Sequence, residues 1–192
     1  KQMVAEGKGI LAADESSGTI KKRFDTINVN SSEENRMNYR RILFESSEAM
    51  ENYISGVILF DETIRQSNND GERLVDIIKK SGSLPGIKVD MGAKTLATMH
   101  DETVTEGLDG LRERLQEYSE LGAKFAKWRA VISISEKNPS ALCINVNAHA
   151  LARYAALCQE SGIVPIVEPE VLMDGSHNIQ KCYDVTKETL LK

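Results

Sequence analysis

The sequence lacks the patterns that mark several classes of protein. It has three cysteines, Cys143, Cys158 and Cys182, with no CxxC or CxxH spacing, so neither a disulfide framework nor a zinc site is expected. No apolar run approaches the roughly 18 to 20 residues that span a bilayer, and no signal peptide opens the chain. These absences favour a cytoplasmic protein in a reducing setting, with no membrane partner.

A basic excess is also missing. The 192 residues carry a net charge of -5, which argues against nucleic acid as a partner because counterion release requires a basic face. A local basic pocket for a phosphorylated small molecule is still compatible with this balance. The three histidines, His100, His149 and His177, lack metal-ligand spacing, so we expect them at the surface or on helices and expect no metal.

What the chain does contain is a repeated alternation of strand-like and helix-like segments. Five apolar segments have strand length: 9–14, 55–60, 85–90, 125–134 and 164–171. Helical stretches follow, for example 33–49, 72–80, 108–121 and 148–161, and Gly82, Gly122 and Gly162 stand where helix C-caps belong. This order predicts an α/β fold with a parallel sheet, formed by about five βα units in one domain, 1–192, with no linker.

Charged residues interrupt the predicted strands where apolar ones belong. Strand side chains alternate between faces, so three pairs each share a face: Lys88 with Asp90, Lys127 with Arg129, and Glu168 with Glu170. The residues that alternate with them, Ile87, Val89, Ala126, Trp128 and Val167, are expected to pack against helices. Asp14 ends the first strand in the same way, and strand ends of this kind are where β/α barrels hold active sites.

The alternative is a structural network of ion pairs. For a single pair of charges, that interpretation is the better one, because ion pairs form without catalysis. For four strands together it is the weaker one, because buried ionic clusters rarely stabilise a protein more than apolar packing does. The pattern therefore favours a functional site.

Seven blocks resemble the class I fructose-bisphosphate aldolase family, in the family's order and spacing and across nearly the whole chain. They are GKGILAADES (7–16), SGVILFDET (55–63), PGIKVD (85–90), GLDGLRER (107–114), FAKWR (125–129), LARYAALCQ (151–159) and PIVEPEVLMDG (165–175). The resemblance implies a (β/α)8 barrel and a cytosolic homo-oligomer, usually a tetramer, that needs no cofactor. It also implies reversible cleavage of fructose 1,6-bisphosphate into dihydroxyacetone phosphate and glyceraldehyde 3-phosphate.

The resemblance also implies the catalytic roles. Class I enzymes form an imine between a lysine amine and the substrate ketone, which then accepts electrons during carbon–carbon cleavage. By resemblance, Glu168 is the general acid/base, Asp14 holds substrate hydroxyls and helps polarise the cleavage, and Lys127 supplies positive charge beside the imine. Glu170 is expected to fix the cations, and Arg129 to be a further inward charge.

Phosphate binding follows from the same resemblance. Lys88, with Ser16 and Thr19 in the loop after the first strand, matches contacts to the phosphate at the aldehyde end. A helix beginning near Gly18 offers free backbone N–H groups to an anion. Lys22 and Arg23 resemble positions near bound phosphate, although a basic pair on a helix is more often a solvated face.

The family's imine-forming lysine lies on a sixth strand, in a motif resembling GTLLKPNM, which this chain does not contain in complete form. The ending ETLLK echoes it, but the periodicity from Ile179 to Leu190 predicts a helix, so Lys192 is not expected to be the nucleophile. We expect a chain truncated at both ends. Two other functions stay open: an incomplete aldolase fragment that binds phosphosugars or a protein, and a phosphosugar isomerase, which would need a histidine at a strand end.

Overall fold

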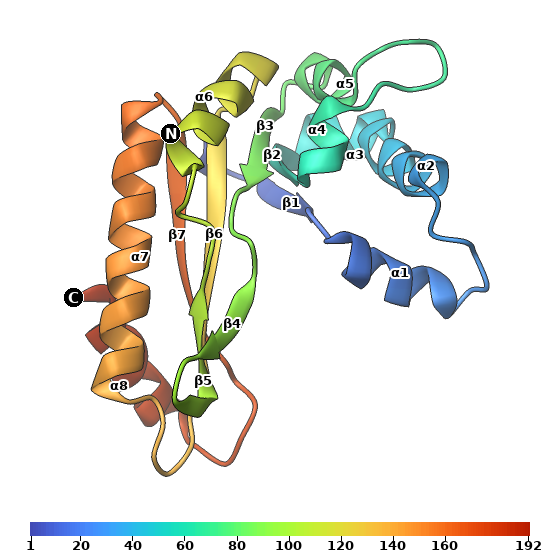
Figure 1. Ribbon diagram of the computed structural model, residues 1–192. Helices are drawn as coiled ribbons and strands as arrows, with labels where there is room; N and C mark the ends of the chain where they lie inside the picture. The colour runs from blue at the N-terminus through green and yellow to red at the C-terminus, as the bar shows by residue number, and fades with distance from the viewer. The chain divides into compact units, whose positions relative to one another are not determined.

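The computed structural model describes the backbone of residues 1–192 and every side chain except that of His100 (Figure 1). Seven strands are present: β1 (Gly9–Ala13), β2 (Ile54–Leu59), β3 (Leu84–Lys88), β4 (Ala93–Leu96), β5 (Met99–Thr105), β6 (Phe125–Ile132) and β7 (Val164–Val171). The helices are η1 (Gln2–Val4), α1 (Ser17–Asp25), α2 (Glu33–Phe44), α3 (Ser47–Tyr53), α4 (Asp61–Arg65), α5 (Leu74–Lys80), α6 (Leu111–Leu121), α7 (Ala141–Glu160) and α8 (Ile179–Leu190). The main sheet has the strand order β1-β2-β3-β6-β7, and β4 and β5 form a separate antiparallel hairpin.

The predicted α/β fold is confirmed, because at least one helix follows each of the five strands of the main sheet. Contacts divide the chain into two compact units. The first contains residues 1–88 and 116–126, and the second contains residues 89–115 and 127–192. The single domain expected for residues 1–192 stays a prediction.

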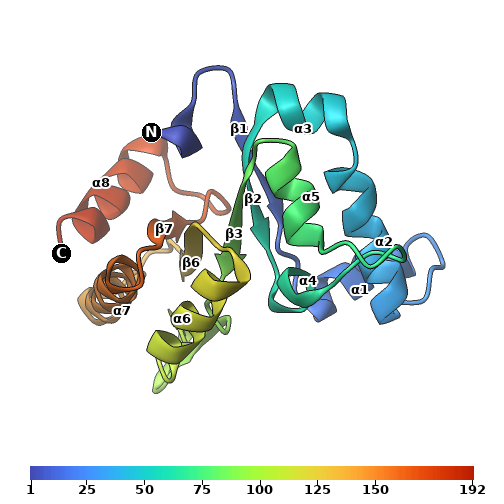
Figure 2. The same cartoon turned by 90° about the horizontal axis from the view of Figure 1, so that it is seen from above.

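The first unit is built on parallel strands. β1 pairs with β2 so that Ala13 lies opposite Leu59, and β2 pairs with β3 so that Leu59 lies opposite Ile87. The three carboxyl ends are therefore level. Helix α3 packs on β2 and α5 packs on β3 (Figure 2). Phe125 lies over this sheet, where only glycine leaves room for its ring: a Cβ added at Gly56 would lie 2.9 Å from the ring.

The second unit packs α7 and α8 against β7, with α7 also contacting β5 (Figure 1). Trp128 is fully buried, and its ring centroid lies 5.6 Å from that of Tyr154 on α7. Asn147, also fully buried, donates to the carbonyl of Thr103 at 2.8 Å and accepts from the N–H of Thr105 at 3.3 Å. This amide joins α7 to the hairpin, because it satisfies strand groups that the hairpin leaves unpaired.

The strand predictions hold to within two residues at each end, and the last strand has the predicted bounds. Gly82, Gly122 and Gly162 follow helix ends with φ of 82°, 114° and 68°, as C-cap glycines do. The burial of Trp128, Ala126, Ile87 and Val89 confirms the predicted alternation of faces in β6 and at β3. The predicted helix from Ile179 to Leu190 is confirmed as α8.

Two helix predictions had wrong bounds. The stretch 33–49 is not one helix: α2 ends at Phe44 and α3 begins at Ser47, because the Ser46 hydroxyl donates to the Ile42 carbonyl at 2.8 Å and ends the first helix. The helix predicted from residue 148 begins at Ala141, because Ser140 caps it by accepting from the Cys143 N–H at 3.1 Å.

Two other features differ from the sequence-based picture. The β4–β5 hairpin was not predicted. Val167 was expected to pack against helices but is 43% exposed. β7 is the last strand in the sheet order, so it has a neighbouring strand on one side only. Of the histidines, His149 is exposed on α7 and His177 lies half-buried before α8, whereas the side chain of His100 lies outside the described part of the chain.

Candidate functional site

In the first unit, two predicted site residues lie at the same level of the sheet. Asp14 follows β1 directly and Lys88 is the last residue of β3. The strand register places both at the carboxyl ends, with β2 between them, so their backbones lie roughly 10 Å apart across the sheet. Asp14 is buried and Lys88 is partly buried. The carboxyl end of parallel strands is where α/β proteins hold ligands, so this placement agrees with the predicted site.

The predicted phosphate loop lies at the start of α1. Ser16 is the N-cap of this helix: its hydroxyl accepts from the Thr19 N–H at 3.3 Å and lies 3.1 Å from the Thr19 hydroxyl. The structure therefore brings Ser16 and Thr19 together at a helix N-terminus, a position that favours anions. Lys22 and Arg23 lie in the last turn of the helix and are exposed.

The sequence interpretation missed a buried group of charges beneath this loop. Arg40 on α2 is fully buried, and its Nη1 donates to the Thr63 hydroxyl at 2.7 Å. Glu15 lies 3.7 Å from Arg40 and also pairs with Arg23, and Glu62 lies 3.8 Å from Arg40. Burial lowers the pKa of the Arg40 guanidinium, whereas the carboxylates of Glu15 and Glu62 act to raise it. A usable signal was present, since Met37, Arg40 and Phe44 recur at helical spacing on one buried face.

In the second unit, the predicted charges of β6 and β7 form two pairs. The Lys127 Nζ lies 3.8 Å from a Glu168 oxygen, and Arg129 pairs with Glu170. Lys127 is 14% exposed and Glu168 33%, so this pair is partly shielded from water. Asp90 lies beside the same strand: its carboxylate accepts from the Gly92 N–H at 3.0 Å and from the Arg129 N–H at 3.5 Å.

Each unit therefore holds part of the predicted site. Asp14, Ser16, Thr19, Lys22, Arg23 and Lys88 belong to the first unit, and Lys127, Arg129, Glu168 and Glu170 to the second. Paired charges are compatible with both a structural network and a catalytic site. The geometry within each unit agrees with the predicted roles, and the roles themselves stay predictions.

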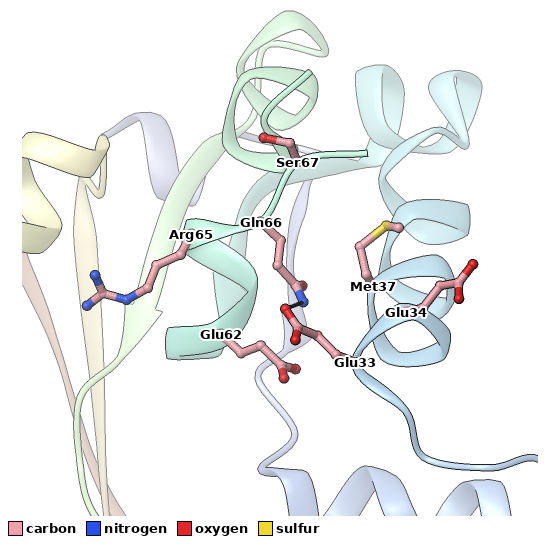
Figure 3. A pocket seen from close by; sticks show the side chains of 7 residues that line it. All are labelled: Glu33, Glu34, Met37, Glu62, Arg65, Gln66 and Ser67. Carbon is pink, nitrogen blue, oxygen red and sulfur yellow. Dashed lines mark hydrogen bonds between the residues drawn. The ribbon is translucent and has the colours of Figure 1, made fainter. Parts of the chain in front are cut away.

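A cavity of about 610 Å³ lies elsewhere in the first unit, lined by residues of α2, α4 and the segment after α4 (Figure 3). Its lining is Glu33, Glu34, Met37, Glu62, Arg65, Gln66 and Ser67. Gln66 donates to Glu33 across it at 3.3 Å. None of the predicted site residues lines this cavity, so it adds no support to the predicted chemistry.

Among the described residues, no group of three or more His, Cys, Asp and Glu side chains could hold a metal ion. In the same part of the chain, no helix is both long and apolar enough to cross a membrane.

Comparisons with known proteins agree with the geometry. The family described as "Fructose-bisphosphate aldolase class-I" matches residues 1–192. "Probable fructose-bisphosphate aldolase class 1" of Xanthomonas axonopodis pv. citri is 61% identical over 188 residues, which are 98% of this chain and 56% of that protein. "Fructose-bisphosphate aldolase 4, cytosolic" of Arabidopsis thaliana is 57% identical over 184 residues, 96% of this chain and 47% of that protein.

A solved structure supports the same relationship. Fructose-bisphosphate aldolase from Plasmodium falciparum, in complex with TRAP and a small-molecule inhibitor, matches with a TM-score of 0.94 and 48% identity. The match covers 98% of this chain and 55% of that one, and the chain spans about half the length of the curated relatives it matches. The sequence, the strand order and these matches place the chain in one family: it belongs to the class I fructose-bisphosphate aldolases.

Proposed function

We propose that the complete protein containing this chain is a class I fructose-bisphosphate aldolase. It would cleave fructose 1,6-bisphosphate reversibly into dihydroxyacetone phosphate and glyceraldehyde 3-phosphate in the cytoplasm, as a homo-oligomer. The observation that carries the proposal is the Lys127–Glu168 pair. The two charged groups are 3.8 Å apart and partly buried, on the neighbouring strands β6 and β7. A cation next to a carboxylate is what imine chemistry requires of the groups around the nucleophile.

In this mechanism, a lysine outside the 192 residues forms the imine with the C2 ketone. Glu168 moves protons while the carbinolamine forms and loses water, and Lys127 stabilises that intermediate by its charge. The C4 hydroxyl then gives its proton to the Glu168 carboxylate, the C3–C4 bond breaks, and the protonated imine accepts the electron pair. Asp14 holds the substrate hydroxyls, and Glu170 keeps Arg129 in place through their ion pair.

Binding of the phosphate at the aldehyde end is assigned to Lys88, Ser16 and Thr19. The support is the N-terminus of α1, where Ser16 and Thr19 place two hydroxyls beside backbone N–H groups. Lys22 and Arg23 are assigned a weaker, longer-range role because both are exposed and Arg23 already pairs with Glu15.

Lys192 is not the imine-forming residue in this proposal. It is exposed and follows the end of α8, not a strand. An imine nucleophile must be a neutral amine, which requires burial and neighbouring cations. Borohydride reduction with dihydroxyacetone phosphate, followed by peptide mass spectrometry, tests this point on the 192-residue chain. We expect no specific adduct. Stoichiometric trapping on Lys192 or Lys127 that is reduced by competing fructose 1,6-bisphosphate would contradict the assignment.

The central experiment uses the complete protein. Glu168→Gln should lower turnover about 100-fold or more while substrate still binds, as loss of an acid/base group does. Lys88→Ala should mainly raise KM for the bisphosphate, because it removes one phosphate contact. Glu113→Gln and Lys80→Ala are the matched controls, since both side chains are exposed on helices of the same chain. Unchanged turnover in Glu168→Gln, or equal effects of Lys88→Ala on bisphosphate and unphosphorylated sugar, would refute these roles.

A further inference from the structure

The guanidinium of Arg40 is bound to two separate segments of the first unit. Its Nη1 donates to the hydroxyl of Thr63, on α4 beyond the end of β2, at 2.7 Å. Its Nη2 donates to the main-chain carbonyl of Glu15, in the loop beyond the end of β1, at 2.5 Å. The side chain has no exposed surface and lies over the ring of Phe60, with 5.8 Å from the guanidinium carbon to the ring centroid. Arg40 therefore connects the segments that follow two neighbouring strands, the loop after β1 and helix α4 after β2.

Stability alone does not account for this arrangement. Burying a guanidinium costs free energy that its ion pairs often fail to recover, and apolar replacements are often neutral or stabilising. Here the compensation is incomplete: the nearest carboxylates lie 3.7 and 3.8 Å away, and the buried Arg40 Nε has no hydrogen-bond partner. A group that is costly to bury and only partly compensated is more useful for fixing a conformation than for stabilising the unit.

The segment that Arg40 holds is short. Glu15 lies between Asp14, which is assigned to the substrate hydroxyls, and Ser16, which caps α1 beside the proposed phosphate position. Two arginines bind Glu15: Arg40 donates to its main-chain carbonyl, and Arg23 pairs with its side-chain carboxylate. Its side chain is 8% exposed. Since both neighbours of Glu15 are proposed substrate contacts, fixing this one residue fixes both of them.

We propose that Arg40 is a positioning residue that fixes the Asp14–Ser16 segment for the phosphorylated substrate, an inference that rests on the proposed function. The fork of a guanidinium reaches the Thr63 hydroxyl and the Glu15 carbonyl with two different nitrogens. The single ammonium group of lysine retains the charge but cannot reproduce two fixed, divergent donors. Charge alone is therefore insufficient at this position.

The test uses Arg40→Lys and Arg40→Met in the complete protein, with Arg41→Met as the control. Arg41 is the next residue on the same helix, is 29% exposed and pairs with Glu45 one turn away at 3.8 Å. Two quantities are measured: amide hydrogen exchange in the peptides that cover 14–20 and 84–88, and steady-state kinetics with fructose 1,6-bisphosphate. Exchange does not depend on catalysis, so it separates failure of this inference from failure of the proposed function.

Arg40→Lys should raise exchange in 14–20 about tenfold, leave 84–88 unchanged within about twofold, and lower kcat/KM about tenfold or more. Arg41→Met should resemble wild type. Wild-type values in Arg40→Lys, or an equal rise in both peptides, would overturn the inference; if Arg40→Met does not fold, Arg40→Lys decides. A wild-type protein without aldolase activity would refute the proposed function, and faster exchange confined to 14–20 would then still support fixation of the segment by Arg40.

Discussion

Replacing Gly86 by alanine should destabilise the first unit through one steric conflict. Gly86 lies in β3, two residues before Lys88, and the ring of Phe125 covers it. A Cβ added there would lie 2.6 Å from Phe125 Cδ2 and closer still to Cε2 and Cζ, all inside the 3.0 Å that real Cβ atoms keep. Phe125 is fully buried, so its ring cannot move into solvent.

The size of the effect follows from this geometry. Overpacking a core costs about 1–3 kcal/mol, and we expect about 3 kcal/mol because three ring atoms must shift within a closed space. Phe125→Ala alone should cost about 3–5 kcal/mol through the cavity it leaves. In the double variant the added methyl no longer meets the ring. The double variant should therefore lose about 3–5 kcal/mol of unfolding free energy, and not the sum of the two single losses, about 6–8 kcal/mol. The difference is a coupling energy of about 3 kcal/mol between the two substitutions.

The assay is urea unfolding of the wild type, both single variants and the double variant. Gly9→Ala is the matched control, because Gly9 also lies in a strand of this unit but nothing lies within 4 Å of its added Cβ. The free energy of unfolding of Gly9→Ala should stay within about 1 kcal/mol of wild type. A loss of less than 1 kcal/mol in Gly86→Ala, or full additivity in the double variant, would refute the reasoning.

Three further predictions concern a helix cap, the thiols and acid pH. Ser140→Ala should lower the free energy of unfolding by about 1 kcal/mol in urea titrations, because the α7 cap is lost. Ser176 is exposed, so Ser176→Ala should change that free energy little, and equal effects of the two variants would contradict the prediction. Burial raises the pKa of the Cys143 thiol and raises that of Cys158 to about 12, so iodoacetamide at pH 8 should label both thiols only after unfolding. Peptide mass spectrometry measures the labelling, and rapid labelling of Cys158 in the native protein would disprove the prediction. The Arg65 guanidinium holds the pKa of Glu117 below its ordinary 4.5, so Glu117→Gln should destabilise the fold at pH 7. The difference in the free energy of unfolding between variant and wild type should disappear as the pH falls through the lowered pKa. If that difference persists at pH 2 in urea titrations, it is inconsistent with the pairing.

Several features could be predicted from the sequence because neighbouring residues decide them. The bounds of β7 and the positive φ of Gly82, Gly122 and Gly162 follow from local composition and chain geometry. The same holds for the faces of β6, where partly buried Lys127 alternates with fully buried Trp128. The motifs that carry the family resemblance are local as well, which is why the fold and the family were both identified correctly.

Tertiary structure decided the features that depend on partners far along the chain. Ser140 caps α7 locally, but it is also bound to a distant residue, since its N–H donates to Glu102, 38 residues earlier, at 2.6 Å. The spacing of Arg40 with Met37 and Phe44 was a local signal of a shared helix face, but the groups that Arg40 binds, the Thr63 hydroxyl and the Glu15 carbonyl, are 23 and 25 residues away. Val167 is 43% exposed, although the alternation of residues in β7 predicted that it would pack against helices. Local residues determined most of the strands and helices and the faces of β6, whereas contacts between distant segments determined which charges are buried, because a buried charge depends on partners that folding brings together.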